Sequence, residues 1–198
     1  MNDVLKKHPG IFLSGNWKSG WSIDLHTVSS SKIDDNNFNT KRTILGELLY
    51  QYKYRNNQSV YNELVDHIYN FTKNLMVIPY ISAIIPVPPS DLSRKYQPTL
   101  ELAKGLSQKI NKQLLYKYLT KIKRTEELKS TTDPQQRKKI LDNAFKVNYN
   151  WMMGKKVLLF DDLYRSGSTL NEITKILYKH GKVQNVYVLT ITKTRSKY

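Results

Sequence analysis

Cysteine is absent from this chain of 198 residues, so disulfide bonds, thiolate catalysis and cysteine-based zinc sites are all excluded. The four histidines do not have the spacing of metal ligands. No apolar run reaches the roughly 18 residues that a membrane-spanning helix needs, and the first residues lack the apolar core of a signal peptide. These absences predict a cytoplasmic protein that does not associate with membranes.

Acidic residues are also scarce, because 16 Asp and Glu face 32 Lys and Arg and leave a net charge of +16. Half of that excess lies between residues 104 and 139, where eleven cations face three anions. A charge of this sign favours an anionic partner, such as a nucleotide, a phosphate or a nucleic-acid backbone. The same positive charge equally suits a basic surface that contacts only water, so charge alone leaves both interpretations open.

Hydrophobic residues make up 39% of the chain, which is enough for one packed core. Residues 1–40 are expected to form an N-terminal extension, either a hood or a packed hairpin, and residues 41–198 one compact unit. The apolar periodicity predicts helices and strands in alternation. The expected helices are 41–53, 60–75, 98–110 and 169–179, and the expected strands are 82–87, 114–119, 157–160 and 186–191. This order predicts an α/β fold with a mostly parallel central sheet flanked by helices.

The most informative stretch is 157–170, where an apolar strand leads into Asp161 and Asp162, a turn of hydroxyl residues with Gly167, and a helix. Ligands bind at the carboxyl ends of parallel strands in open α/β folds. Backbone N–H groups of the turn and of the helix start can bind a phosphate. The two carboxylates can accept hydrogen bonds from sugar hydroxyls or hold a hydrated Mg²⁺. The alternative is a plain strand–turn–helix in which both carboxylates only cap the turn.

These residues resemble the signature of type I phosphoribosyltransferases, which bind 5-phosphoribosyl 1-pyrophosphate (PRPP). The resemblance implies that Asp161 and Asp162 are catalytic and hold Mg²⁺ through water. It also implies a 5-phosphate loop made of Tyr164, Arg165, Ser166, Gly167, Ser168 and Thr169. Many members have Thr-Thr-Gly where this chain has Arg165-Ser166-Gly167. Tyr164 and Arg165 are poor bases at neutral pH, which disfavours a purine-salvage reaction.

Further motifs resemble the ComF branch, the competence-associated phosphoribosyltransferase-like proteins. These motifs are Lys53-Tyr54-Arg55, the Pro-Val-Pro run at 86–88 with the basic stretch after it, and Asn143-Ala144-Phe145. The resemblance covers residues 42–193, without the four-cysteine zinc module of many members and with Lys95-Tyr96-Gln97-Pro98 in place of a Gly-Phe-Asn-Gln core. By position it implies pyrophosphate contacts from Ser90, Arg94, Lys123 and Arg124. Residues 88–94 also suit an ordinary strand exit.

The expected function is therefore Mg²⁺-dependent transfer of a phosphoribosyl group from PRPP to an unknown acceptor, a glycosyltransferase reaction of nucleotide metabolism. One alternative is a non-catalytic sensor of PRPP or of a nucleotide. Another is a protein that binds single-stranded nucleic acid in DNA uptake or processing. In that case Tyr116, Tyr118 and Tyr149 would stack on bases beside the basic segment, unless they are buried on strands. A homodimer is compatible with each alternative.

Overall fold

A six-stranded sheet forms the centre of the computed structural model, which describes residues 10–32, 38–89, 96–123, 133, 136 and 140–195. Its strand order is β1-β2-β10-β9-β5-β6, and only the β1–β2 pair is antiparallel. The strands are β1 (Ile11–Phe12), β2 (Ser19–Leu25), β5 (Ala83–Pro86), β6 (Gln113–Leu114), β9 (Lys156–Tyr164) and β10 (Asn185–Lys193). The predicted α/β class with a mostly parallel sheet is confirmed.

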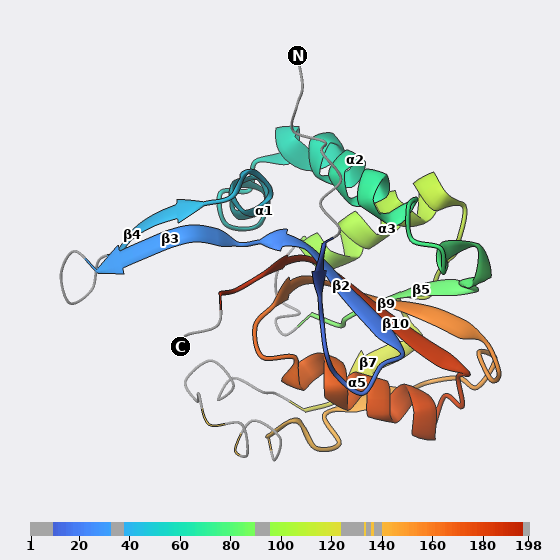
Figure 1. The fold of residues 1–198 in the computed structure, drawn as a ribbon. Coiled ribbons are helices and arrows are strands. Elements are labelled where there is room, and N and C mark those ends of the chain that lie inside the picture. The colour runs from blue at the N-terminus through green and yellow to red at the C-terminus, as the bar shows by residue number, and fades with distance from the viewer. Residues whose placement is uncertain are drawn as a thin grey trace.

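Helices cover both faces of this sheet (Figure 1). One face carries α1 (Ile44–Tyr54), α2 (Tyr61–Thr72) and α3 (Pro98–Ile110), and the opposite face carries α5 (Ser168–Lys179). Two short 3₁₀ turns, η1 (Gln58–Val60) and η2 (Ile78–Tyr80), flank α2. None of the helices in the described parts of the chain is long and apolar enough to cross a membrane.

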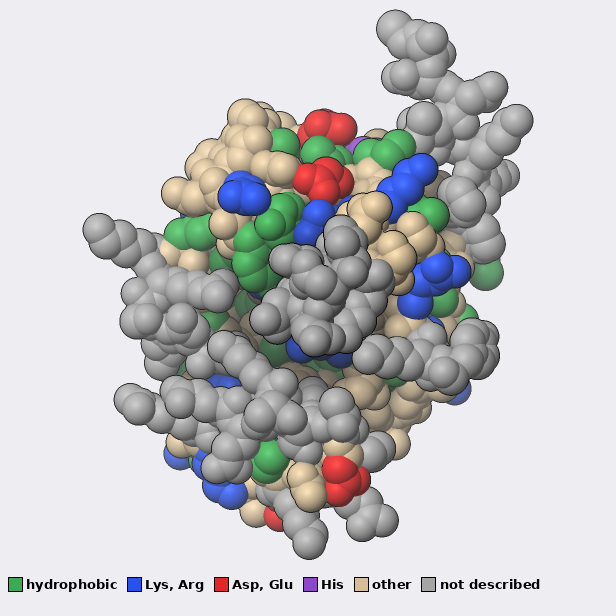
Figure 2. All heavy atoms as spheres, turned by 90° about the vertical axis from the view of Figure 1, so that its left-hand side faces the viewer, with side chains coloured by type: hydrophobic (Ala, Val, Ile, Leu, Met, Phe, Trp, Pro, Cys, Tyr) green, Lys and Arg blue, Asp and Glu red, His purple; other side chains and the backbone are tan. Residues whose placement is uncertain are grey.

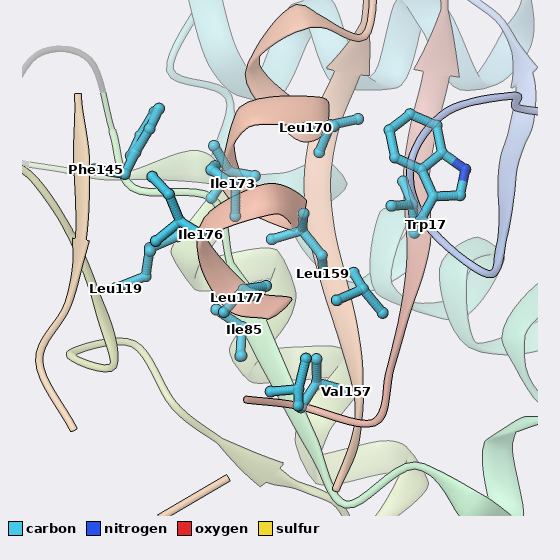
Figure 3. Close-up of a cluster of buried hydrophobic side chains, with 14 of the residues drawn as sticks. Trp17, Ile85, Leu119, Phe145, Val157, Leu159, Leu170, Ile173, Ile176 and Leu177 are labelled. Atoms are coloured by element: carbon cyan, nitrogen blue, oxygen red, sulfur yellow. The ribbon is translucent and has the colours of Figure 1, made fainter. Parts of the chain in front are cut away.

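Strand β9 shows why the central strands are apolar along their whole length. Side chains alternate between the two faces of a strand, so a strand between two layers of helices buries both sets. Val157 and Leu159 pack with Ile173 and Leu177 of α5 in one hydrophobic cluster (Figure 3). Leu158 and Phe160 belong to the cluster on the α1–α3 face. This alternation continues to the end of β9, where it orients the two aspartates.

The segment before residue 42 contributes directly to the central sheet. Strand β2 pairs in parallel with β10, with Trp21 opposite Leu189. Trp17 is buried, and its indole N–H donates to the Leu13 carbonyl at 2.8 Å. Strands β3 (Thr27–Lys32) and β4 (Phe38–Arg42) then form a two-stranded hairpin that projects from the body beside α1 (Figure 1).

The single strand expected at 114–119 is wrong, because the structure divides this stretch. Residues up to Leu114 belong to β6 at the sheet edge, and a turn at Tyr116 and Lys117 then redirects the chain. Strand β7 (Leu119–Lys121) pairs antiparallel with β8 (Phe145–Val147) in a separate two-stranded sheet. Periodicity alone could not locate the turn, since it contains neither Gly nor Pro.

Candidate functional site

The carboxyl end of β9 carries Asp161 and Asp162, because the strand extends to Tyr164 instead of ending at Phe160. Consecutive strand residues point to opposite faces, so the two carboxylates diverge. Asp161 lines a hollow on the α5 side. Asp162 lies on the α1–α3 side, where it is 5% exposed. The two aspartates therefore have different partners, although they are adjacent in sequence.

Asp162 is held by one side chain from each of two helices. Its Oδ2 accepts a hydrogen bond from Lys53 Nζ of α1 at 2.6 Å and another from Thr99 Oγ1 of α3 at 3.0 Å. Burial by itself would lower the pKa of Lys53, but the attraction of Asp162 outweighs it and the pKa is raised. Lys53 is therefore a charged lysine inside the candidate site. The sequence indicated it only as part of the ComF resemblance.

Asp161 borders the hollow, and its carboxyl group is a weaker acid than an ordinary aspartate. Its Oδ1 accepts the backbone N–H of Asp162 at 2.9 Å. Burial, followed by the negative charge of Asp162, raises the pKa of Asp161 to about 7, although Lys53 opposes the shift. A carboxyl group of this kind exchanges its proton near neutral pH, so it can donate or accept a hydrogen bond there.

The loop after β9 encloses a hollow of about 80 Å³ together with the first turn of α5. The volume suffices for several water molecules, and hence for a phosphate group. Asp161 and all six predicted phosphate-loop residues line it: Tyr164, Arg165, Ser166, Gly167, Ser168 and Thr169. The structure thus brings this part of the predicted site together.

Gly167 gives the hollow its shape. Its φ of +74° lies in the left-handed region, and a Cβ there would lie 2.6 Å from the Tyr164 hydroxyl oxygen. As the N-cap of α5, Gly167 offers no side-chain acceptor to the first backbone N–H groups of the helix. Ser166 Oγ and Ser168 Oγ lie 2.9 Å apart beside them. The Ser168 N–H has only a long bond of 3.5 Å to Ser166 Oγ. N–H groups at the helix start, hydroxyls and the positive end of the helix dipole together favour an anion.

Additional ionisable side chains lie beside Asp162, at the carboxyl end of β2. His26 Nδ1 is 3.1 Å from Thr192 Oγ1 of β10. Burial, then the positive charge of Arg42, lowers the pKa of His26, so its ring is neutral at neutral pH. The Arg42 guanidinium stacks 3.6 Å from the centre of the Tyr50 ring. Seen from this edge, Lys and Arg side chains are spread over the surface among hydrophobic ones (Figure 2).

The predicted pyrophosphate contacts are mostly outside the described residues, since Ser90, Arg94 and Arg124 all fall in gaps. Lys123 is described; its Nζ donates to the Asp142 carbonyl at 2.6 Å, and it does not line the hollow. The described residues contain no cluster of three or more His, Asp or Glu side chains that could hold a metal.

No family model and no curated protein matches the sequence. Among solved structures, 27 chains match. UMP synthase from Leishmania donovani is 16% identical with a TM-score of 0.40, over 84% of this chain and 28% of that one. Adenine phosphoribosyltransferase from Trypanosoma brucei, solved with AMP, pyrophosphate and ribose-5-phosphate, is 12% identical with a TM-score of 0.44, over 85% and 87% of the two chains. The Leishmania donovani adenine enzyme is 8% identical with a TM-score of 0.37, over 86% and 75%.

Proposed function

We propose that this chain is a ComF-like member of the type I phosphoribosyltransferases that binds PRPP at the carboxyl end of β9. One observation carries the proposal: Asp161 and the predicted phosphate-loop residues line the same hollow. A phosphorylated ribose needs both groups, because its phosphate requires donors and its hydroxyls require an acceptor. The 5-phosphate would lie on residues 164–169, with the ribose hydroxyls directed at Asp161.

In this proposal Asp162 serves a reaction that builds positive charge on the ribose, with part of its own charge offset by Lys53. When a nucleophile displaces pyrophosphate, the anomeric carbon becomes electron-poor, and a fixed carboxylate nearby stabilises it. Lys53 and Thr99 fix Asp162 in one orientation, so no reorganisation is needed during the reaction. In this proposal Ser90, Arg94 and Arg124 contact the pyrophosphate, and Lys123 leaves the Asp142 carbonyl to join them.

In this proposal Mg²⁺ enters the site together with the substrate. The Asp162 Oδ2 atom already accepts two hydrogen bonds, whereas Asp161 borders the hollow. Mg²⁺ is commonly held by one or two carboxylates, several waters and substrate phosphates. Asp161 would hold it through water, and the ion would offset the negative charge of the departing pyrophosphate.

Calorimetric titration of PRPP with Mg²⁺ tests the proposal. Wild type is expected to bind, and Asp161→Asn to bind at least tenfold more weakly, because the hydroxyl acceptor is weakened. The double variant Asp161→Asn/Asp162→Asn should show no binding heat. Asp142→Asn, at an exposed carboxylate that pairs with Lys175, should bind like wild type. Absence of heat in wild type, or equal heat in wild type and the double variant, would overturn the proposal.

Gly167→Ala is expected to weaken PRPP binding at least tenfold. The new Cβ would force the Tyr164 ring out of its place, and the left-handed φ adds about 1 kcal/mol of strain. Ribose-5-phosphate should lose affinity by a similar factor, because both ligands use the same phosphate site. The same titrations measure this, and a variant that keeps wild-type affinity for both ligands would place the 5-phosphate elsewhere.

An assay of pyrophosphate release distinguishes an enzyme from a non-catalytic sensor. Incubation with PRPP, Mg²⁺ and a panel of nucleobases and amines, including ammonia, measures that release. Release above the PRPP hydrolysis background with any acceptor identifies an enzyme and its acceptor class. Tight binding without release identifies a sensor, which the lack of a good base in the turn at Tyr164 and Arg165 favours.

A further inference from the structure

Exposed aromatic rings gather at the opposite end of the sheet from the phosphate hollow. Tyr149 and Trp151 are 51% and 59% exposed, and their ring centres lie 4.9 Å apart at an interplanar angle of 58°. Met153 and Tyr116, from the same region, are also exposed. Single exposed apolar residues are ordinary, but a group of them indicates a contact surface. The phosphate site does not use this group.

Hydrogen bonds hold the segment that carries these rings between two neighbouring loops. Asn148 Nδ2 donates to the Lys117 carbonyl and to Thr120 Oγ1, both at 2.7 Å. Further along, the Gly154 N–H donates to the Lys182 carbonyl at 2.9 Å. Between these anchors, residues 147–151 and His180 line an open hollow of about 510 Å³. The hollow is several times larger than the phosphate hollow and could accommodate a nucleobase.

The charged side chains in the described segments beside the rings are all lysines. Residues 115–118, 146–155 and 179–184 contain no Asp or Glu. Exposed lysines occur in each of these three segments: Lys117, Lys146, Lys155, Lys179 and Lys182. The Lys117 ammonium lies 5.4 Å from the centre of the Tyr116 ring. We define Tyr149, Trp151 and these five lysines as the aromatic–lysine patch.

We propose that the aromatic–lysine patch binds single-stranded nucleic acid, with bases stacked on Tyr149 and Trp151 and phosphates on the lysines. Charge complementarity selects a polyanion, and flat exposed rings select one with free base faces. A duplex hides those faces, so it would meet the lysines alone. Tyr118, which the sequence grouped with Tyr116 and Tyr149 as a stacking residue, is 1% exposed and takes no part. Trp151 takes its place.

The patch and the phosphate hollow should act independently, because β9 separates them. Its nine residues span about 30 Å, at roughly 3.3 Å per residue. Helix α5 begins at the phosphate hollow and ends with His180 as its C-cap, beside the patch (Figure 1). Loss of nucleic-acid binding can therefore be distinguished from loss of PRPP binding.

Fluorescence anisotropy with a labelled 20-nucleotide oligo(dT), from low to near-physiological salt, tests the patch. Wild type should bind, and Tyr149→Ala/Trp151→Ala should bind 10- to 100-fold more weakly with an unchanged salt slope, because only stacking is lost. Lys155→Gln/Lys182→Gln should instead make the slope of log affinity against log salt shallower by about 0.7 per lysine. Phe12→Ala and Lys73→Gln, at exposed sites elsewhere, should behave like wild type.

Quenching of tryptophan fluorescence by unlabelled oligo(dT) provides a second measurement on the unmodified chain. The quenching should be absent from the Tyr149→Ala/Trp151→Ala variant, which keeps Trp17 and Trp21. Thermal unfolding and PRPP titration of each variant show whether its fold is intact. Absence of binding at low salt, equal binding by the Tyr149→Ala/Trp151→Ala variant, or equally tight binding of a duplex would overturn the proposal. The last two outcomes would assign binding to lysines alone.

Discussion

Replacing Lys53 with methionine should lower the free energy of unfolding by about 3 kcal/mol, because it leaves the buried Asp162 carboxylate without its cation. The ion pair is 2.6 Å long, and its side chains are only 20% and 7% exposed. Water therefore cannot replace the lost partner, and the hydrogen bond from Thr99 compensates for only part of the charge. Urea denaturation with a linear extrapolation measures the change.

The chain offers a matched control at its surface. Lys109 and Asp66 also form a pair of 2.6 Å, but their side chains are 43% and 55% exposed. Lys109→Met should therefore change stability by less than about 1 kcal/mol. In addition, Lys53→Met/Asp162→Asn should be more stable than Lys53→Met alone, because no unpaired charge is buried. If Lys53→Met destabilises no more than Lys109→Met, the buried pair does not stabilise the fold.

Gly46→Ala should destabilise the protein by about 2–3 kcal/mol, although alanine normally improves a helix over glycine by roughly 0.5–1 kcal/mol. Gly46 lies in the first turn of α1, where a Cβ would lie 2.1 Å from the His26 carbonyl oxygen and 2.9 Å from its carbon. Both atoms are backbone, so α1 must move away from the end of β2. Because Lys53 is on the same helix, its contact with Asp162 should weaken too.

Thermal or urea unfolding measures the loss of stability in Gly46→Ala, and Gly154→Ala is the control. Gly154 has a left-handed φ of +72° but nothing within 4 Å of an added Cβ, so only backbone strain of about 1 kcal/mol is expected. The two variants separate the effect of crowding from the effect of conformation. A Gly46→Ala protein as stable as wild type would show that α1 does not press against β2.

The candidate site was predictable from sequence only where it is local. Strand β9, the turn at Gly167 and helix α5 follow one another within 24 residues, so the pattern of apolar, acidic and small residues could be read directly. The contact between Lys53 and Asp162 joins residues 109 positions apart, and no periodicity reports such a pairing. The divergence of Asp161 and Asp162 was also missed, because the strand was expected to end before them.

The helices and strands were likewise predictable where they depend on local sequence. Helices α1, α2, α3 and α5 were expected within a few residues of their actual bounds, since each carries its own apolar stripe. Membership of β2 in the central sheet depends on its pairing with β10, 168 residues later, and could not be inferred from local pattern. Exposure of Trp151 is likewise a tertiary property, because a tryptophan in a short loop is more often packed inward.

The position of β10 has a consequence for how the chain is made. This last strand lies between β2 and β9, so it joins the first major strand to the rest of the sheet. During synthesis, β2 and the β5–β9 part can exist only as separate pieces until residues 185–193 have been added. The exposed edges of β2 and β9 are then open to wrong pairing, and contacts of such long sequence separation form slowly. A ribosome that stalls after β9 and before β10 would therefore hold a chain with two unpaired strand edges, which is a substrate for chaperones.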